Sequence, residues 1–218
     1  MIKGVIFDMD GVLVDNREAH IEAFVIFCRR YGIDMSHDAL MPFYGMGNDE
    51  IIPEFIPREI IDRVGLNALA DEKEAIYRDI YASTIEPVAG LAELLDELRE
   101  EGVTLAVGSS GMKANVDYVL EKCGITEYFD VVVNGDMVTR RKPDPEIFLL
   151  CARLMGLTPA QCLVFEDSLA GLKAARSAGM KVVALATTLP VEELKAKANT
   201  DLIVNDFTGI TPGQVTDM

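Results

Sequence analysis

Short apolar runs alternate with amphipathic segments of helical length along most of this chain, and this alternation limits the possible folds most strongly. The apolar runs lie near residues 2–7, 103–107, 131–133, 162–165, 181–186 and 202–204. Helical patterns follow at about 90–101, 112–124, 145–156, 168–179 and 190–198. Such alternation is typical of a parallel sheet with helices on both faces. We therefore expect an α/β fold with a doubly wound, Rossmann-like parallel-sheet core.

One long segment, residues 16–86, interrupts this alternation. It carries helical patterns at about 17–31, 48–55, 58–65 and 68–83 and no convincing strand. We therefore expect an inserted helical domain at 16–86, with 1–15 and 87–218 forming the α/β core. The tail from residue 208 to 218 is rich in Thr, Gly and Asp, and we expect it to fray.

Two acidic pairs stand at the ends of predicted strands. Asp8 and Asp10 follow the first apolar run, and Glu166 and Asp167 close the fourth. In an open α/β sheet, ligands bind beyond the carboxyl ends of the strands. If the first strand continued through Asp10, Asp8 and Asp10 would point to the same side. Carboxylates that share a site need a cation or a shared proton, and Mg²⁺ prefers such oxygen ligands.

Two further strand or loop ends carry groups that suit a phosphate. Ser109 follows the second core strand, and its hydroxyl with the neighbouring amides fits phosphate oxygens. Lys142, between Arg141 and Pro143, supplies a point charge. Each feature has a plain alternative when taken alone. The acids could belong to turns or helix caps, Asp167 or Ser168 could merely cap the next helix, and a lone lysine is usually solvated.

Together, and in this order and spacing, the stretches Asp8-Met9-Asp10-Gly11-Val12, Ser109, Lys142-Pro143 and Glu166-Asp167 resemble the four motifs of the haloacid dehalogenase superfamily. The resemblance covers the chain from Met1 to about residue 205. It is closest to the β-phosphoglucomutase and phosphoglycolate phosphatase branch, of which the stretches 142–148 and 165–171 are typical. It implies the predicted fold, with residues 16–86 as a helical cap that closes over the active site.

The resemblance also implies roles for these residues. Asp8 matches the nucleophile that forms an aspartyl-phosphate, and Asp10 matches the general acid/base. Ser109 and Lys142 would hold the transferring phosphoryl group. Asp8, Glu166 and Asp167 would bind Mg²⁺, together with the backbone carbonyl of Asp10.

Substrate contacts are expected from a second set of residues, namely Asn16, His20, Gly47, Asn48, Ser110 and Asn115. His20 matches a histidine of the β-phosphoglucomutase pattern that partners the general acid/base. The pattern then fails at one place. The mutase cap has an arginine that grips a second phosphate, whereas this chain has Gly45-Met46-Gly47-Asn48 in that neighbourhood. The stretch after Ser109 also lacks the mutase order.

These residues favour a Mg²⁺-dependent phosphatase acting on a small phosphorylated metabolite, for which a sugar phosphate is one candidate. A β-phosphoglucomutase-like mutase is the alternative, because it shares every core residue and differs only in the cap. A dehalogenase is disfavoured, because displacing a halide would leave Asp10, Glu166 and Asp167 without a role. A binding module that had lost its activity should lack at least one core residue, and none is missing.

Composition limits the partners and the compartment. With 36 acidic and 20 basic residues the net charge is −16, which disfavours nucleic acid. No apolar run is long enough for a membrane span, and Met1 leads straight into the first strand without a signal-peptide pattern. Four cysteines without a CxxC pair suggest reduced thiols. We expect a cytoplasmic monomer whose partner is a small phosphate ester.

Overall fold

The computed structural model describes residues 1–40, 43 and 46–218. By their internal packing, these residues divide into two compact units, one formed by Met1–Asp15 with Ile85–Met218 and the other by Asn16–Thr84. We call them the α/β unit and the helical unit, and describe each by itself.

The α/β unit is built on a sheet of six parallel strands in the order β3-β2-β1-β4-β5-β6. The strands are β1 (Gly4–Phe7), β2 (Thr104–Gly108), β3 (Val131–Val133), β4 (Cys162–Glu166), β5 (Lys181–Leu185) and β6 (Leu202–Val204). The central strands β1 and β4 are buried along their whole length, as their continuous apolar runs require for a sheet covered on both faces. The predicted doubly wound parallel sheet is confirmed.

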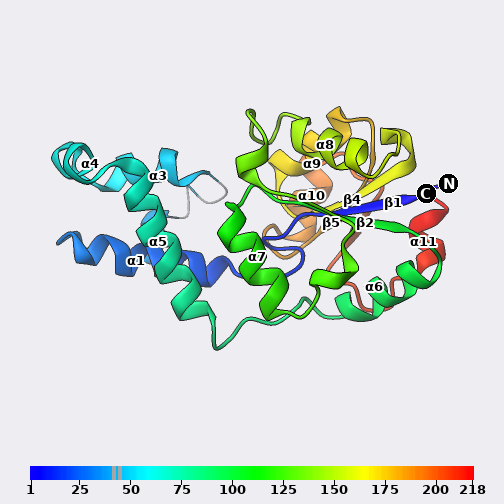
Figure 1. Ribbon diagram of the computed structural model, residues 1–218, viewed down its shortest axis with the longest axis horizontal. Helices are drawn as coiled ribbons and strands as arrows, with labels where there is room; N and C mark the ends of the chain where they lie inside the picture. The colour runs from blue at the N-terminus through cyan, green and yellow to red at the C-terminus, as the bar shows by residue number, and fades with distance from the viewer. Residues whose placement is uncertain (41–42, 44–45) are drawn as a thin grey trace. The chain divides into compact units, whose positions relative to one another are not determined.

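Helices cover both faces of this sheet (Figure 1). They are α6 (Leu91–Glu100), α7 (Lys113–Lys122), α8 (Glu146–Leu154), α9 (Leu169–Ser177), α10 (Val191–Lys197) and α11 (Pro212–Thr216). Apolar side chains of α8, α9 and α10 form one core with one face of the sheet, including Phe148, Leu172 and Leu194. Figure 1 shows α6, α7 and α11 on the opposite face.

The expectation that the tail frays was wrong. Residues Pro212–Thr216 form α11, with Thr211 as N-cap accepting a hydrogen bond from the backbone of Gln214. Pro212 and Val215 are buried, and the carbonyl of Thr216 accepts a hydrogen bond of 3.0 Å from the backbone N–H of Ile2. The cap and these apolar contacts hold a segment whose composition alone suggested disorder.

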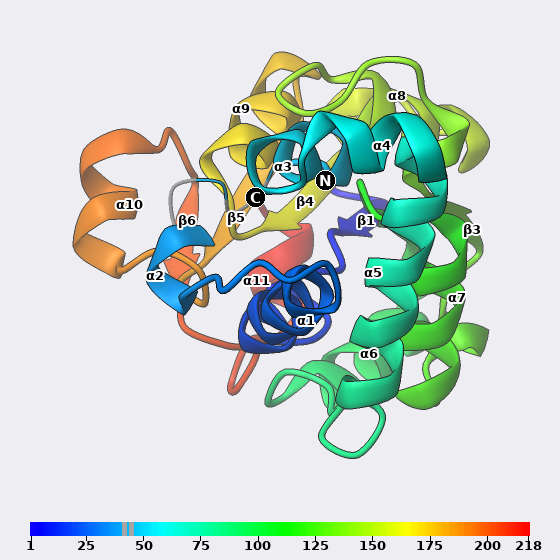
Figure 2. The same cartoon turned by 90° about the vertical axis from the view of Figure 1, so that its left-hand side faces the viewer.

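The helical unit consists of α1 (Arg17–Arg30), α2 (His37–Leu40), α3 (Asn48–Phe55), α4 (Arg58–Val64) and α5 (Leu66–Tyr81). The long helix α5 contacts α1, α3 and α4 (Figure 2). Among the described helices, α2 is one that the sequence patterns did not predict.

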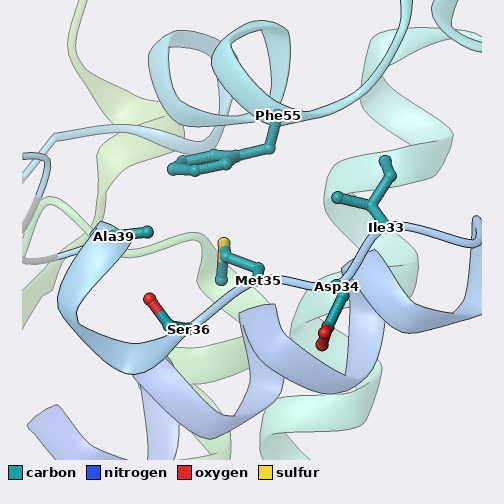
Figure 3. A pocket seen from close by; sticks show the side chains of 6 residues that line it. All are labelled: Ile33, Asp34, Met35, Ser36, Ala39 and Phe55. Atoms are coloured by element: carbon teal, nitrogen blue, oxygen red, sulfur yellow. The ribbon is translucent and has the colours of Figure 1, made fainter.

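A shallow cavity of about 310 Å³ lies in the helical unit, lined by Ile33, Asp34, Met35, Ser36, Ala39 and Phe55 (Figure 3). Phe55 and Met35 face into it, whereas the carboxylate of Asp34 points away (Figure 3). None of the residues predicted to act in catalysis lines this cavity.

Candidate active site

Three buried carboxylates meet where β1 and β4 end. These two strands are neighbours with Phe7 opposite Phe165, so that Asp8, which follows β1, stands beside Glu166. Asp167 is the first residue after β4. One oxygen of each carboxylate of Asp8, Glu166 and Asp167 lies within 4.8 Å of the others. The parallel register of two strands therefore brings residues far apart in the sequence to one point.

The side chain of Lys142 reaches this carboxylate cluster. Its Nζ donates hydrogen bonds to Asp8 Oδ1 at 2.5 Å and to Glu166 Oε1 at 2.8 Å. The same Nζ lies 4.7 Å from the centre of the Phe148 ring. The ammonium group is thus buried between two carboxylates and an aromatic face, and its position is well defined.

The loop that carries Lys142 is held by the first turn of α8. The carboxylate of Glu146 accepts hydrogen bonds from the backbone N–H groups of Thr139 at 3.1 Å and Arg140 at 2.8 Å. Asp144 Oδ1 accepts a hydrogen bond of 3.0 Å from the backbone of Glu146. An acid in the first turn also suits the positive end of the helix dipole. These hydrogen bonds fix the backbone of the loop from which the Lys142 side chain extends.

Burial dominates the electrostatics of the cluster. It raises the pKa of Asp8 to about 7, although the charge of Lys142 opposes the rise and those of Glu166 and Asp10 add to it. Burial, together with the charges of Glu166 and Asp8, also raises the pKa of Asp167 well above its usual value. For Lys142, burial lowers the pKa, but the two carboxylates outweigh burial and leave it above its ordinary value. One ammonium group does not balance three carboxylates, so the site has room for further positive charge.

The donor set of this cluster fits a hard divalent cation. All three candidate ligands are carboxylates, which Mg²⁺ prefers over nitrogen or sulfur. Both oxygens of Glu166 already accept hydrogen bonds, Oε1 from Lys142 and Oε2 from the backbone and hydroxyl of Ser168 at 2.7 and 3.0 Å. The carboxylate of Glu166 is therefore the most firmly held of the three.

Asp10 is placed differently from the expectation based on a continuing strand. The strand β1 ends at Phe7, and the chain turns at Gly11 with φ +76°. The alternation of strand side chains therefore does not orient Asp10, which is half-buried and pairs through its backbone with Val14. Its side chain is not among the three clustered carboxylates, and a metal contact through its carbonyl stays a prediction.

Ser109 lies at the same edge of the sheet. It follows β2, which pairs with β1, and its side chain is fully buried. Its Oγ accepts a hydrogen bond of 3.0 Å from the backbone N–H of Gly111. Of the two residues predicted to bind substrate nearby, Asn115 is buried in the first turn of α7, and Ser110 is exposed.

The remaining predicted substrate residues belong to the helical unit, where they join a polar network. Asn16 Nδ2 donates to the Tyr77 hydroxyl at 2.8 Å, and the His20 ring stacks on that of Tyr77 with 3.9 Å between centroids. His20 Nδ1 lies 2.8 Å from Lys73 Nζ. The network therefore places a buried ammonium group at the Nδ1 edge of His20 and an aromatic ring against its face.

Asn48 joins the same network through Glu74. Its Nδ2 donates to Glu74 Oε1 at 2.7 Å, and the same oxygen accepts from Lys73 Nζ at 2.8 Å. Burial opposes ionisation of Glu74, but the Lys73 charge and the hydrogen bonds outweigh it and lower the pKa of Glu74 to about 2. Gly47 precedes α3, with its N–H bound to Glu50. Gly45, named with these residues in the sequence, lies outside the described residues.

Sequence reasoning missed four polar residues that contact the predicted ones. Lys73 and Glu74 are neighbours in α5 and are both buried. The spacing of Lys73 four residues from both Leu69 and Tyr77 places it on the buried face of the helix, and this signal could have found it. Thr187 and Thr188 follow β5. The hydroxyl of Thr187 donates a hydrogen bond to the Gly11 carbonyl, and that of Thr188 donates one to the Asp167 carboxylate.

A parallel sheet with acids, a lysine and a buried serine at its carboxyl edge defines a class of α/β enzymes that act at the ends of their strands. Residues 5–185 match the family described as haloacid dehalogenase-like hydrolase. The chain therefore belongs to this family, and the predicted superfamily and enzyme class, a phosphoric monoester hydrolase, are confirmed.

Named relatives agree with this assignment. Fructose-1-phosphate phosphatase YqaB of Escherichia coli is 36% identical over 83% of this chain and 94% of its own length. β-Phosphoglucomutase of Bacillus subtilis is 28% identical over 96% and 92%. The crystal structure of CbbY from Rhodobacter sphaeroides in complex with phosphate superposes with a TM-score of 0.84 at 28% identity, covering 96% of each chain. The chain also spans 20% of the length of a larger Arabidopsis thaliana relative, Protein SUPPRESSOR OF QUENCHING 1, at 32% identity.

None of the helices in the described part of the chain is long and apolar enough to cross a membrane. All four cysteines are free thiols, and Cys28, Cys151 and Cys162 are buried.

Proposed function

We propose that this chain is a Mg²⁺-dependent phosphatase that hydrolyses a small phosphorylated metabolite, of the sugar phosphate class, through an aspartyl-phosphate on Asp8. The observation that carries the proposal is the cluster of Asp8, Glu166 and Asp167 with the Lys142 ammonium in contact with Asp8. The names of the relatives support the substrate class, since one is a phosphatase of a sugar phosphate.

In the first half of the reaction, Asp8 attacks the phosphorus and the bond from phosphorus to the substrate oxygen breaks. Asp10 gives its proton to the departing oxygen, which leaves as an alcohol. Lys142 balances charge on the transferring group and orients Asp8, and Ser109 with the amides after β2 holds phosphoryl oxygens. Asp8, Glu166 and Asp167 would hold Mg²⁺, whose positive charge would favour the ionised carboxylates and an anionic substrate.

In the second half, Asp10 takes a proton from a water molecule that attacks the phosphorus. The bond from phosphorus to Asp8 breaks, and inorganic phosphate and the free carboxylate are formed. Asp10 thus returns to its protonated state, and no other reactant is consumed.

A mutase remains the second candidate, because β-phosphoglucomutase is among the relatives and the core motifs are the same. The residues of the helical unit argue for hydrolysis. Asn48 stands in the neighbourhood of the mutase arginine, and its amide bonds to the ionised Glu74 instead of offering positive charge. A carboxylate in this place disfavours a second phosphate, which a bisphosphate intermediate needs.

The test is a product analysis over a panel of phosphate esters with Mg²⁺, including β-glucose 1-phosphate with its bisphosphate activator. We expect inorganic phosphate to appear faster than glucose 6-phosphate for any accepted sugar, and activity to disappear in excess EDTA. A dominant flux to glucose 6-phosphate would instead assign the mutase. Full activity in EDTA would contradict the metal requirement.

We also propose that residues 16–86 serve as the cap that selects the substrate, with contacts from Asn16, His20, Gly47 and Asn48. Closure over a phosphoryl-transfer site would exclude bulk water from the aspartyl-phosphate. Lys73 and Glu74, which hold His20 and Asn48, would then set the polarity of the substrate end.

A further inference from the structure

The two threonines that follow β5 each bond to a different loop of the active site. Strand β5 pairs with β4 in parallel, so the loop after β5 leaves the sheet beside Glu166 and Asp167. Thr187 Oγ1 donates to the backbone carbonyl of Gly11 at 2.5 Å. Thr188 Oγ1 donates to Asp167 Oδ2. One short loop therefore contacts both acid-bearing segments of the α/β unit.

Close packing around Asp167 leaves its carboxylate little freedom. The residue is 4% exposed, and the missing side chain of Gly11 makes room for it. A Cβ at Gly11 would lie 2.0 Å from Asp167 Oδ2 and 3.2 Å from Thr188 Oγ1. The glycine, the aspartate and the threonine thus meet at one point, and the hydroxyl is the group that contacts the carboxylate by a hydrogen bond.

To hold Mg²⁺, Asp167 would have to present an oxygen in a fixed direction, because Mg²⁺ demands near-ideal octahedral geometry. Asp167 lies just beyond the last residue of β4, where the strand no longer fixes its conformation. A hydrogen bond to one carboxylate oxygen fixes the rotation of the group and leaves the other oxygen for the metal. Groups that orient metal ligands in this way typically change metal affinity about 10- to 100-fold when removed.

We propose that Thr188 is a positioning residue that holds Asp167 for Mg²⁺, an inference that rests on the proposed metal-dependent function. The hydroxyl of Thr188 acts through its hydrogen bond to Asp167 and is not itself proposed as a metal ligand. Its loss weakens Mg²⁺ binding and leaves the rate at saturating Mg²⁺ much less affected.

The test measures Mg²⁺ binding without substrate, by calorimetric titration and by the shift in melting temperature, for three variants at this position. Thr188→Val and Thr188→Ala remove the hydroxyl, with and without a methyl group in its place, and Thr188→Ser keeps it. We expect about 10- to 100-fold weaker Mg²⁺ binding in the Val and Ala variants and binding close to wild type in the Ser variant. Thr208→Val, at an exposed threonine, is the matched control and should bind Mg²⁺ as the wild type does.

The outcomes separate this inference from the proposed function. If the wild type binds Mg²⁺ and the Val and Ala variants bind it equally well, the role of Thr188 is refuted and the phosphatase stands. If the Ser variant is as weak as the Ala variant, the methyl group and not the hydroxyl matters, which also refutes it. If the wild type does not bind Mg²⁺, both proposals fall. The Ala variant decides the question should the Val variant not fold, as circular dichroism in EDTA will show.

Discussion

Replacing Gly171 by alanine should disrupt the active site, although the same change stabilises most helices. Gly171 lies in the first turn of α9, and its N–H donates to the Ser168 hydroxyl at 3.0 Å. A Cβ at this position would lie 1.7 Å from Glu166 Oε1 and 2.0 Å from Glu166 Cδ. Atoms that are not bonded do not approach so closely, so the carboxylate of Glu166 would have to move.

Glu166 has little room to move. Its two oxygens accept hydrogen bonds from Lys142 and from Ser168 at 2.7–3.0 Å. Alanine gains about 1 kcal/mol of helix propensity over glycine. Against this gain stand about 1–3 kcal/mol for overpacking and about 1.5–3 kcal/mol for a lost hydrogen bond to a charged group. The balance is a loss of about 1.5–5 kcal/mol in the free energy of unfolding.

Urea unfolding followed by circular dichroism measures this loss, and phosphate release measures the activity. We expect the urea midpoint to fall and activity to drop at least about tenfold. A displaced Glu166 would misplace Lys142, and a rise of about 1.4 kcal/mol in the activation free energy corresponds to that factor. Gly213→Ala in α11 is the matched control, because beyond its chain neighbours and its own helix backbone nothing described lies within 4 Å of the position that its Cβ would take, and its stability should stay equal or rise. A Gly171→Ala protein as stable and as active as the wild type would refute the reasoning.

Three further changes test other parts of the molecule. Asp8→Asn should abolish turnover while the fold persists, because an amide does not attack phosphorus; retention of more than a few per cent of the rate would exclude Asp8 as nucleophile. Asn48→Ala should alter KM and substrate preference far more than the urea midpoint, and an unchanged substrate profile would contradict its role. The pKa of Glu74 is lowered to about 2 in the folded protein, so its contribution of on the order of 3 kcal/mol is present above about pH 4.5 and lost as the pH falls toward 2. Glu74→Gln should lack this part of the acid-induced loss of stability, and identical pH profiles of the urea midpoint for the two proteins would contradict the assignment.

The strands were predictable because each is a short run of apolar residues that ends at a polar or glycine signal. The run at 131–133 coincides with β3, and the run at 162–165 differs from β4 by one residue. Each strand can be recognised from its own few residues. The helices that connect successive strands then make their arrangement parallel. The meeting of Asp8 with Glu166 was predictable for the same reason, since both stand at strand ends.

Contacts that depend on tertiary packing could not be predicted from local sequence patterns. Thr188 bonds to Asp167 across two loops, and no local pattern marks that threonine. The pairing of Lys73 with His20 joins positions 53 residues apart on different helices. The tail was misjudged because its composition outweighed the capping signal of Thr211 with Gln214, which the structure shows to be used.

The contact between the two ends of the chain has a practical consequence. Ile2 and Thr216 are joined by a backbone hydrogen bond, and both termini lie close together at the end of the sheet where β1 begins (Figure 1). Asp8 and Asp167 lie at the opposite ends of their strands. A short peptide between residues 218 and 1 would therefore close the chain into a ring without approaching the carboxylates, and new ends could be opened in an exposed loop such as the one around Gly156. An affinity tag on either end of this chain would extend from that same remote edge.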